Sequence, residues 1–186
     1  MTELRCPACG DARSVPTRFC RECGLDVEGP GAVLSPRTVR GWQLGPDAGC
    51  RGADLANTQL QGLDLSRSDF REAHLTHAVL ARTTLREADL RDANARGANL
   101  RGATLAGADL TGADLTGADL SGADLVGATL FGATAFQASF RNADLRGATL
   151  ARADLTEAIL RGADLRGVDL SDAVLRETDL RDVQRD

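Results

Sequence analysis

Leucine recurs at every fifth position through most of the chain. There are 26 such positions from residue 55 to residue 180; 22 of them hold Leu, and the other four hold Phe or Ala. The residue two places before each of these positions is Ala in 20 of the 26 cases. No insertion interrupts the register. The pattern therefore predicts a single structural unit of five residues that is repeated along the chain.

A period of five fits neither an α-helix nor a flat strand. In an α-helix, five residues advance by about 500°, so successive leucines would wander around the helix instead of forming one apolar stripe. In a strand, an odd period places successive leucines on opposite faces. We therefore predict that the chain turns a corner every five residues, with each Leu and the preceding Ala facing inward. Successive turns would then stack about 4.8 Å apart through backbone hydrogen bonds.

The most regular stretch, residues 107–125, repeats Gly-Ala-Asp-Leu with one residue between the units. This pattern resembles the pentapeptide-repeat family, whose motif is A-(D/N)-L-x-x. The resemblance extends over residues 53–180, which is most of the chain. It implies an all-β fold, a right-handed quadrilateral β-helix with four pentapeptides in each coil. On that geometry the 26 repeats form a rod about 31 Å long, and Cys50 is a buried residue at its start.

Composition divides the chain into three expected parts: a zinc ribbon at 1–26, a connector and N-terminal cap at 27–49, and the solenoid at 50–186. The connector is punctuated by Pro30, Pro36 and Pro46. It also holds apolar residues, which we expect to cover the open end of the solenoid: Val33, Leu34, Trp42 and Leu44. A short motif that binds a partner is the alternative interpretation of these residues.

The opposite end of the solenoid has no sequence typical of a cap. Only six residues follow Leu180, and they do not form an apolar segment that could cover Leu175 and Leu180. Some members of the family that this chain resembles stack end to end. We therefore expect a homodimer formed through the last coil.

Four cysteines near the start have the spacing of a metal site. Cys6 and Cys9 form one Cys-x-x-Cys-Gly unit, and Cys20 and Cys23 form a second. Two residues between thiolates allow both sulfurs to bind one tetrahedral ion, so we predict a zinc ribbon with one structural Zn²⁺. Two disulfides or a redox Cys-x-x-Cys pair are the alternatives. Because four cysteines leave no open position, this zinc would not be catalytic.

The charge pattern limits the function classes. All 22 basic residues are Arg, the formal net charge is −5, and only 3% of the residues are aromatic. Nucleic-acid binding is therefore not expected of the rod, and the balanced charge of the ribbon makes it a weak third possibility there. No apolar run is long enough to cross a membrane, and Met1–Cys9 contains no secretory signal. We therefore expect a cytoplasmic protein without a membrane segment.

Acidic residues could form a functional face. On the implied geometry, Asp69, Asp89 and Asp109 stack on one side of the rod. The family that this chain resembles includes quinolone-resistance proteins that imitate duplex DNA and bind DNA gyrase, so modulation of gyrase or another type II topoisomerase is an alternative function. Duplex DNA carries about 18 charges over the length of this rod, far more than the net charge of −5. Solvation of an apolar rod by Asp and Arg is the simpler explanation.

Three apolar residues interrupt the polar outer positions. Val126, Phe131 and Phe136 each follow a buried position on successive sides of one coil, where other coils have Thr, Ser or Arg. They form a candidate docking site for an unidentified protein partner. His74 and His77 are the only histidines, both are expected to face outward, and no catalytic motif accompanies them. We therefore predict a protein that is not an enzyme and acts as a protein–protein interaction scaffold.

Overall fold

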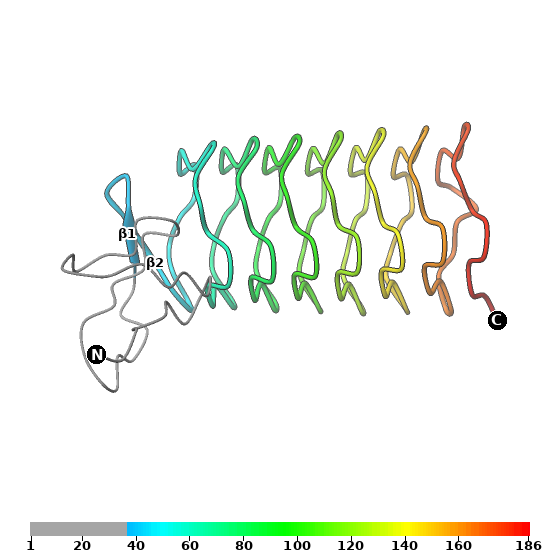
Figure 1. Ribbon diagram of the computed structural model, residues 1–186, viewed down its shortest axis with the longest axis horizontal. Helices are drawn as coiled ribbons and strands as arrows, with labels where there is room; N and C mark the ends of the chain where they lie inside the picture. Colours follow the sequence, from blue (N-terminus) through cyan, green and yellow to red (C-terminus); the bar gives the residue numbers. More distant parts are fainter. Residues whose placement is uncertain (1–36) are drawn as a thin grey trace, which may run out of the picture.

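A short hairpin precedes a rod of stacked coils in the computed structural model, which describes residues 37–186 (Figure 1). The hairpin consists of β1 (Arg37–Val39) and β2 (Trp42–Leu44), which are antiparallel. Arg40 and Gly41 connect them with φ values of 48° and 85°. Two consecutive positive φ angles are typical of the tight turns that close hairpins. Within this part of the chain there is no helix that could cross a membrane.

The rod is held together by parallel bridges between residues that are twenty positions apart. They run from Gly49–Asp69 near the start to Asp164–Gln184 at the end. Twenty residues are four pentapeptides, so each coil has four sides. The coils are visible in Figure 1 as parallel loops of similar size along the rod. The predicted all-β solenoid, with a corner after every fifth residue, is therefore confirmed.

A pentapeptide within the middle of the rod uses four of its five backbone N–H groups in backbone hydrogen bonds. In one repeat, Leu110 donates to the C=O of Thr129 in the next coil, and Asp109 donates to the C=O of Ala88 in the previous coil, at 2.7 and 2.9 Å. The N–H of Ala108 closes a corner on the C=O of Leu105, at 2.9 Å. The N–H at the second corner position also reaches the next coil. Only the N–H at the first corner position takes no part in these bonds.

The second corner position requires a left-handed backbone. This residue has a positive φ in every repeat from Asp47 to Asp182 except at Asp172. A positive φ at the third residue of a turn is the mark of a type II turn, which favours Gly. Gly122, at 67°, is one of many glycines here, but Arg67 and Glu87 adopt the same conformation at 57° and 54°. The corner geometry is therefore imposed by the ladder even where the residue is not Gly.

The core is a column of inward leucines with small residues between them. Cys50 lies at the first of these positions and is completely buried, and burial raises the pKa of its thiol to about 11. A thiol with so high a pKa is almost never a thiolate near neutral pH, so Cys50 is a packing residue. Phe70 and Phe140 replace Leu at two positions and are also buried.

The hairpin covers the N-terminal end of this core. Leu44 is only 2% exposed and belongs to the core cluster, while Val39 and Trp42 pack against it. Ion pairs between Arg40 and Asp54 and between Arg67 and Asp47, each at 2.8 Å, join this end to the first coils.

The C-terminal end is open. Leu170, Leu175 and Leu180 are partly exposed because no coil lies beyond them. The ladder is also interrupted on one side of the last coil, where residues 149 and 169 form no bridge. There the N–H of Arg152 binds the C=O of Asp172, at 3.2 Å, in place of the residue before it. The shift is local to residues 169–172, because the regular ladder resumes with the bridge between Asp154 and Val174.

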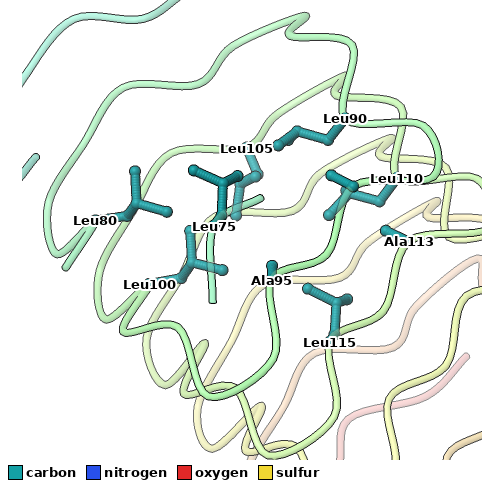
Figure 2. Close-up of a pocket in the computed structure, with 10 residues that line it drawn as sticks. Leu75, Leu80, Leu90, Ala95, Leu100, Leu105, Leu110, Ala113 and Leu115 are labelled. Carbon is teal, nitrogen blue, oxygen red and sulfur yellow. The ribbon is translucent and has the colours of Figure 1, made fainter. Parts of the chain in front are cut away.

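One small defect lies within the core. Ala95 stands at an inward position that holds Leu in the coils on either side, Leu75 and Leu115. An apolar cavity of about 10 Å³ lies beside it, lined only by Leu and Ala side chains (Figure 2). Side chains around a void lose packing contacts that a filled core would supply.

Replacement of Ala95 by Leu should therefore stabilise the rod. The next coil already has Leu at all four inward positions with the same backbone bonding, so Ala95→Leu should raise the free energy of unfolding by about 1 kcal/mol. Ala103→Leu is the matched control, because Ala103 is completely buried and does not line the cavity. Overpacking should make it less stable by about 1–3 kcal/mol. Denaturant unfolding measures both, and a destabilised Ala95→Leu variant would contradict this explanation of the cavity.

Candidate interaction surface

Most aspartates that precede a buried Leu have a structural role. Their Oδ1 accepts a hydrogen bond from the N–H two residues later, the one N–H that the backbone ladder leaves free. Asp109 and Thr111 are an example, at 2.9 Å. The same bond, at 2.8–3.3 Å, is made by Asp or Asn at fifteen positions: 54, 64, 69, 89, 94, 99, 109, 114, 119, 124, 144, 154, 164, 169 and 179. This local turn explains why the repeat prefers Asp or Asn there.

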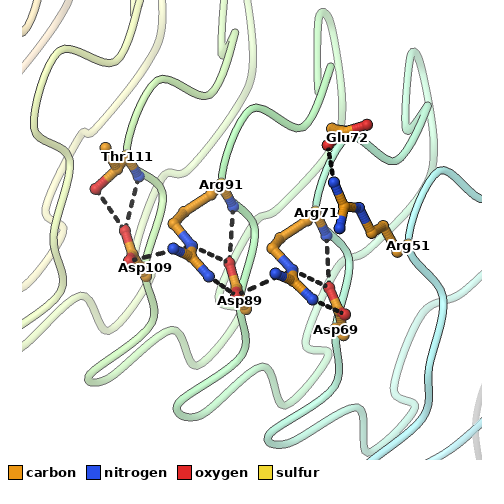
Figure 3. A network of polar contacts seen from close by, with 8 residues as sticks. All are labelled: Arg51, Asp69, Arg71, Glu72, Asp89, Arg91, Asp109 and Thr111. Carbon is orange, nitrogen blue, oxygen red and sulfur yellow. Dashed lines mark hydrogen bonds and ion pairs between the residues drawn. The ribbon is translucent and has the colours of Figure 1, made fainter.

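The structure brings the candidate acidic face together but pairs it with arginines (Figure 3). Asp69, Asp89 and Asp109 stack in one column through parallel bridges. Arg71 lies 2.6 Å from Asp69 and 3.4 Å from Asp89. Arg91 lies 2.6 Å from Asp89 and 3.7 Å from Asp109. The column is therefore an alternating ladder of charges with little unpaired acidity.

Residues 105–124 form a coil that contains four aspartates and no Arg, and arginines of earlier residues pair with these aspartates. The four aspartates lie on four different sides of the rod. An arginine from earlier in the chain reaches each of them, at 3.1–3.7 Å: Arg91 to Asp109, Arg96 to Asp114, Arg101 to Asp119 and Arg86 to Asp124. These pairs are partly exposed, so each contributes only about 0–1 kcal/mol to stability. Their main consequence is that no side of this coil presents a free acid.

Ion pairing extends along the rod. Between residues 37 and 186, thirteen of the 22 acidic side chains lie within 4.0 Å of an arginine. Imitation of duplex DNA depends on carboxylates that remain available to a protein that binds phosphates. The paired surface therefore weakens that interpretation.

One coil differs from all of these. Residues 125–140 contain no charged side chain. Val126 and Phe131 are 36% and 39% exposed, and Val174 is the only other large hydrophobic residue that is exposed in the described part of the chain. Phe136, expected to be equally exposed, is half-buried. Residues 125–140 are called the uncharged coil below.

The uncharged coil also lacks the local turn made by aspartate. Thr129 and Thr134 occupy the positions that precede the buried residue, and neither accepts a hydrogen bond from the N–H of Phe131 or Phe136. The guanidinium carbon of Arg152, from the next coil, lies 5.5 Å from the centre of the Phe131 ring, which is a cation–π contact. The coil therefore combines exposed apolar surface, unused backbone donors and a nearby cation.

Sequence reasoning found Phe131 but missed Arg152. Arg152 belongs to the following coil, and only the stacking of the coils brings it to the ring. The run of residues 125–140 without a charged side chain was the available signal that the outer surface changes here.

The remaining sequence predictions concern the four N-terminal cysteines, the connector and the two histidines. The cysteines predicted to bind zinc, Cys6, Cys9, Cys20 and Cys23, lie outside the described residues, as do Val33 and Leu34. His74 and His77 are exposed. Residues 37–186 contain no group of three His, Cys, Asp or Glu side chains that could hold a metal ion.

The ladder of Asp69, Asp89 and Asp109 predicts a pH-dependent stability. Hydrogen bonds from Arg71 lower the pKa of Asp69 to about 2, and hydrogen bonds from Arg91 lower the pKa of Asp89. An unfolded Asp has a pKa of about 3.9, so as the pH falls the unfolded chain binds protons first. The stabilisation should be complete above about pH 5 and should be lost between about pH 4 and pH 2.

The Asp69→Asn variant tests this, because Asn keeps the local turn but loses the charge. Its unfolding midpoint should change less between about pH 6 and pH 3 than that of the unmodified protein. Asp92→Asn is the control, since the Asp92 carboxylate has no arginine within 4.0 Å in residues 37–186. The same pH dependence in all three proteins would contradict a contribution from this ladder.

Comparison with known proteins agrees with the coil geometry. A family model for pentapeptide repeats matches residues 48–86, 68–105, 93–132, 136–176 and 149–184. No match was found among curated proteins. Among solved structures, the chain is similar to HetL from the cyanobacterium Nostoc sp. strain PCC 7120, a pentapeptide repeat protein involved in heterocyst differentiation regulation. The identity is 37% over 72% of each chain, with a TM-score of 0.32.

The chain is also similar to two further solved structures. A pentapeptide repeat protein from the thylakoid lumen of Arabidopsis thaliana is 33% identical over 59% of this chain and 74% of its own, with a TM-score of 0.43. The plasmid-mediated fluoroquinolone resistance protein QnrB1 is 24% identical over 75% of this chain and 78% of its own, with a TM-score of 0.43. From its family match and its ladder of four-sided coils, the chain belongs to the pentapeptide repeat family.

Proposed function

We propose that this protein is a non-catalytic protein–protein interaction scaffold, and that the uncharged coil is its docking surface. The observation that carries the proposal is the coincidence, in one coil, of exposed Val126 and Phe131 with the complete absence of charge. Elsewhere on the rod, many acidic side chains pair with an arginine, and many accept a hydrogen bond from the N–H of their own corner. The uncharged coil has no such internal use for its outer side chains.

The chemistry of this surface resembles the centre of a protein interface. Aromatic residues and arginine are enriched among the residues that dominate binding energy, and Phe131 is already in contact with Arg152. Exposed apolar surface bordered by polar groups is typical of binding sites in soluble proteins. A rigid rod suits such a role because its outer side chains are held at fixed spacings by the ladder.

Two substitutions at the uncharged coil test the proposal. Phe131→Asp combined with Phe136→Asp should leave the ladder intact, because neither residue is at an inward position, and should weaken binding of a partner by about tenfold or more. The partner would be isolated by cross-linking on the unmodified protein and then purified for a direct affinity measurement.

The control places the same charge on the corner of Phe136, away from the uncharged coil. Ala56→Asp combined with Thr76→Asp occupies the position equivalent to Phe136 in two coils near the N-terminal end. This control should bind the partner as the unmodified protein does. A partner whose affinity is unchanged by the Phe131 and Phe136 substitutions would refute the docking surface.

Modulation of DNA gyrase or another type II topoisomerase is the alternative function, favoured by the net charge of −5 and the rod shape. Supercoiling assays with the purified full chain test it directly. Because Asp69, Asp89 and Asp109 are paired with arginine, we expect no inhibition at micromolar concentration. Inhibition that disappears when these three residues are replaced by Arg would instead establish the DNA-mimic interpretation.

Two assembly proposals accompany the function. One structural Zn²⁺ bound by Cys6, Cys9, Cys20 and Cys23 rests on their spacing, and metal analysis of the purified chain tests it. A homodimer through the last coil is supported by the partly exposed Leu170, Leu175 and Leu180 at the open end, and light scattering tests it. A cytoplasmic location remains part of the same proposal.

A further inference from the structure

The corner at Phe131 lacks an Asp carboxylate that other corners on this side of the rod have. At an ordinary corner on this side, one Asp carboxylate serves two donors at once. Asp69 accepts a hydrogen bond from the N–H of Arg71 at 3.1 Å and from the guanidinium of the same residue at 2.6–2.9 Å. Asp89 and Arg91 repeat this arrangement one coil later, at 3.2 Å and 2.6–2.8 Å.

At Phe131 the backbone N–H remains, but the carboxylate is absent and Phe stands where Arg71 and Arg91 stand in the earlier coils. Thr129 stands where Asp69, Asp89 and Asp109 stand in the earlier coils of the same column. The N–H of Phe131 has no hydrogen-bond acceptor among residues 37–186. A cation is nonetheless close by, because the exposed guanidinium of Arg152 lies over the Phe131 ring.

Arg152 is not neutralised by the described part of its own chain. No carboxylate of residues 37–186 lies within 4.0 Å of it. Asp172 is the acid that stacks twenty residues after Arg152, in the arrangement by which Arg67 binds Asp47. The local shift at residues 169–172 instead gives Arg152 only the backbone C=O of Asp172, which accepts a hydrogen bond from the N–H of Arg152. The guanidinium is therefore available to a carboxylate from another molecule.

We infer that the surface around Phe131 binds an acidic segment of a partner protein, in which a carboxylate is adjacent to an apolar side chain. This inference rests on the proposed docking function and names the chemistry of the partner. The carboxylate takes the place of the aspartate missing at Thr129 and accepts hydrogen bonds from the Phe131 N–H and the Arg152 guanidinium. The adjacent apolar side chain packs on the Phe131 ring and Val126.

The energetics favour a charged acceptor over a neutral one. Hydrogen bonds to an ionised group are about twice as strong as those between neutral groups. The nearest acid of the preceding coil on this side, Asp109, is already engaged by Arg91 and Thr111. The other acids near this corner are Asp169 and Asp172, which are exposed two coils after Phe131 and limit the site to a short acidic segment.

Selection from a library of short random peptides displayed on phage, with the immobilised full chain as bait, tests the inference. Enriched peptides should contain Asp or Glu next to an apolar residue. Their affinity should fall by about tenfold when that acid is changed to its amide, and by a similar factor with the Arg152→Gln protein. Arg141→Gln is the control, because Arg141 lies on another corner, also lacks a carboxylate within 4.0 Å in residues 37–186, and carries the same charge. It should leave affinity unchanged.

The outcomes distinguish the inference about the acidic partner from the proposed docking surface. Peptides that lose affinity with Phe131→Ser, but bind equally well as acids and as amides, would overturn the inference about charge and leave the docking surface in place. Peptides that ignore both Phe131→Ser and Arg152→Gln, or a selection without enrichment, would overturn both. A loss of affinity with Arg141→Gln equal to that with Arg152→Gln would show a general charge effect and would also overturn the inference.

Discussion

The hydrogen-bonded ladder between coils is the interaction on which every other feature depends. It engages four of the five N–H groups in a repeat, so backbone satisfaction is nearly complete before any side chain contributes. It also requires a left-handed residue at each corner and holds Arg67 and Glu87 in that conformation, as well as glycine. A side chain on such a backbone has a fixed direction, either into the core or out to the surface.

The aspartate of the repeat completes this ladder. It binds the remaining N–H at its corner, as Asp109 does with that of Thr111. The same carboxylate also forms an ion pair with an arginine, as in Asp69, so one residue both completes the turn and pairs a surface charge. The acidic composition of the rod is thus mostly a consequence of how its corners are built. An acidic net charge in this fold is a poor guide to an acidic binding face.

The proposed site lies where this pattern of corner aspartates paired with arginines is interrupted. Thr129 and Thr134 leave the corner N–H groups free, Phe131 replaces the usual polar or arginine side chain, and Arg152 is left without an acid from the described part of the chain. None of these changes disturbs the ladder, since bridges at 129 and 134 continue on both sides. The rod can therefore change its surface chemistry in one coil at little cost to its stability, which allows a repeat protein to carry a binding site.

The sequence by itself determined the solenoid, its register and its inward residues, because a period of five with Leu and Ala at fixed places is compatible with very few backbones. It also singled out Phe131 as an outward apolar residue. Only the tertiary structure decided which charges meet. Arg86 reaches Asp124, and Arg152 reaches Phe131, although the partners of each pair lie in different coils. Such contacts depend on side-chain directions between stacked coils, and the composition of a single repeat contains no information about them. The local shift at residues 169–172, where the N–H of Arg152 binds the C=O of Asp172 and not that of Ser171, was likewise visible only in the tertiary structure.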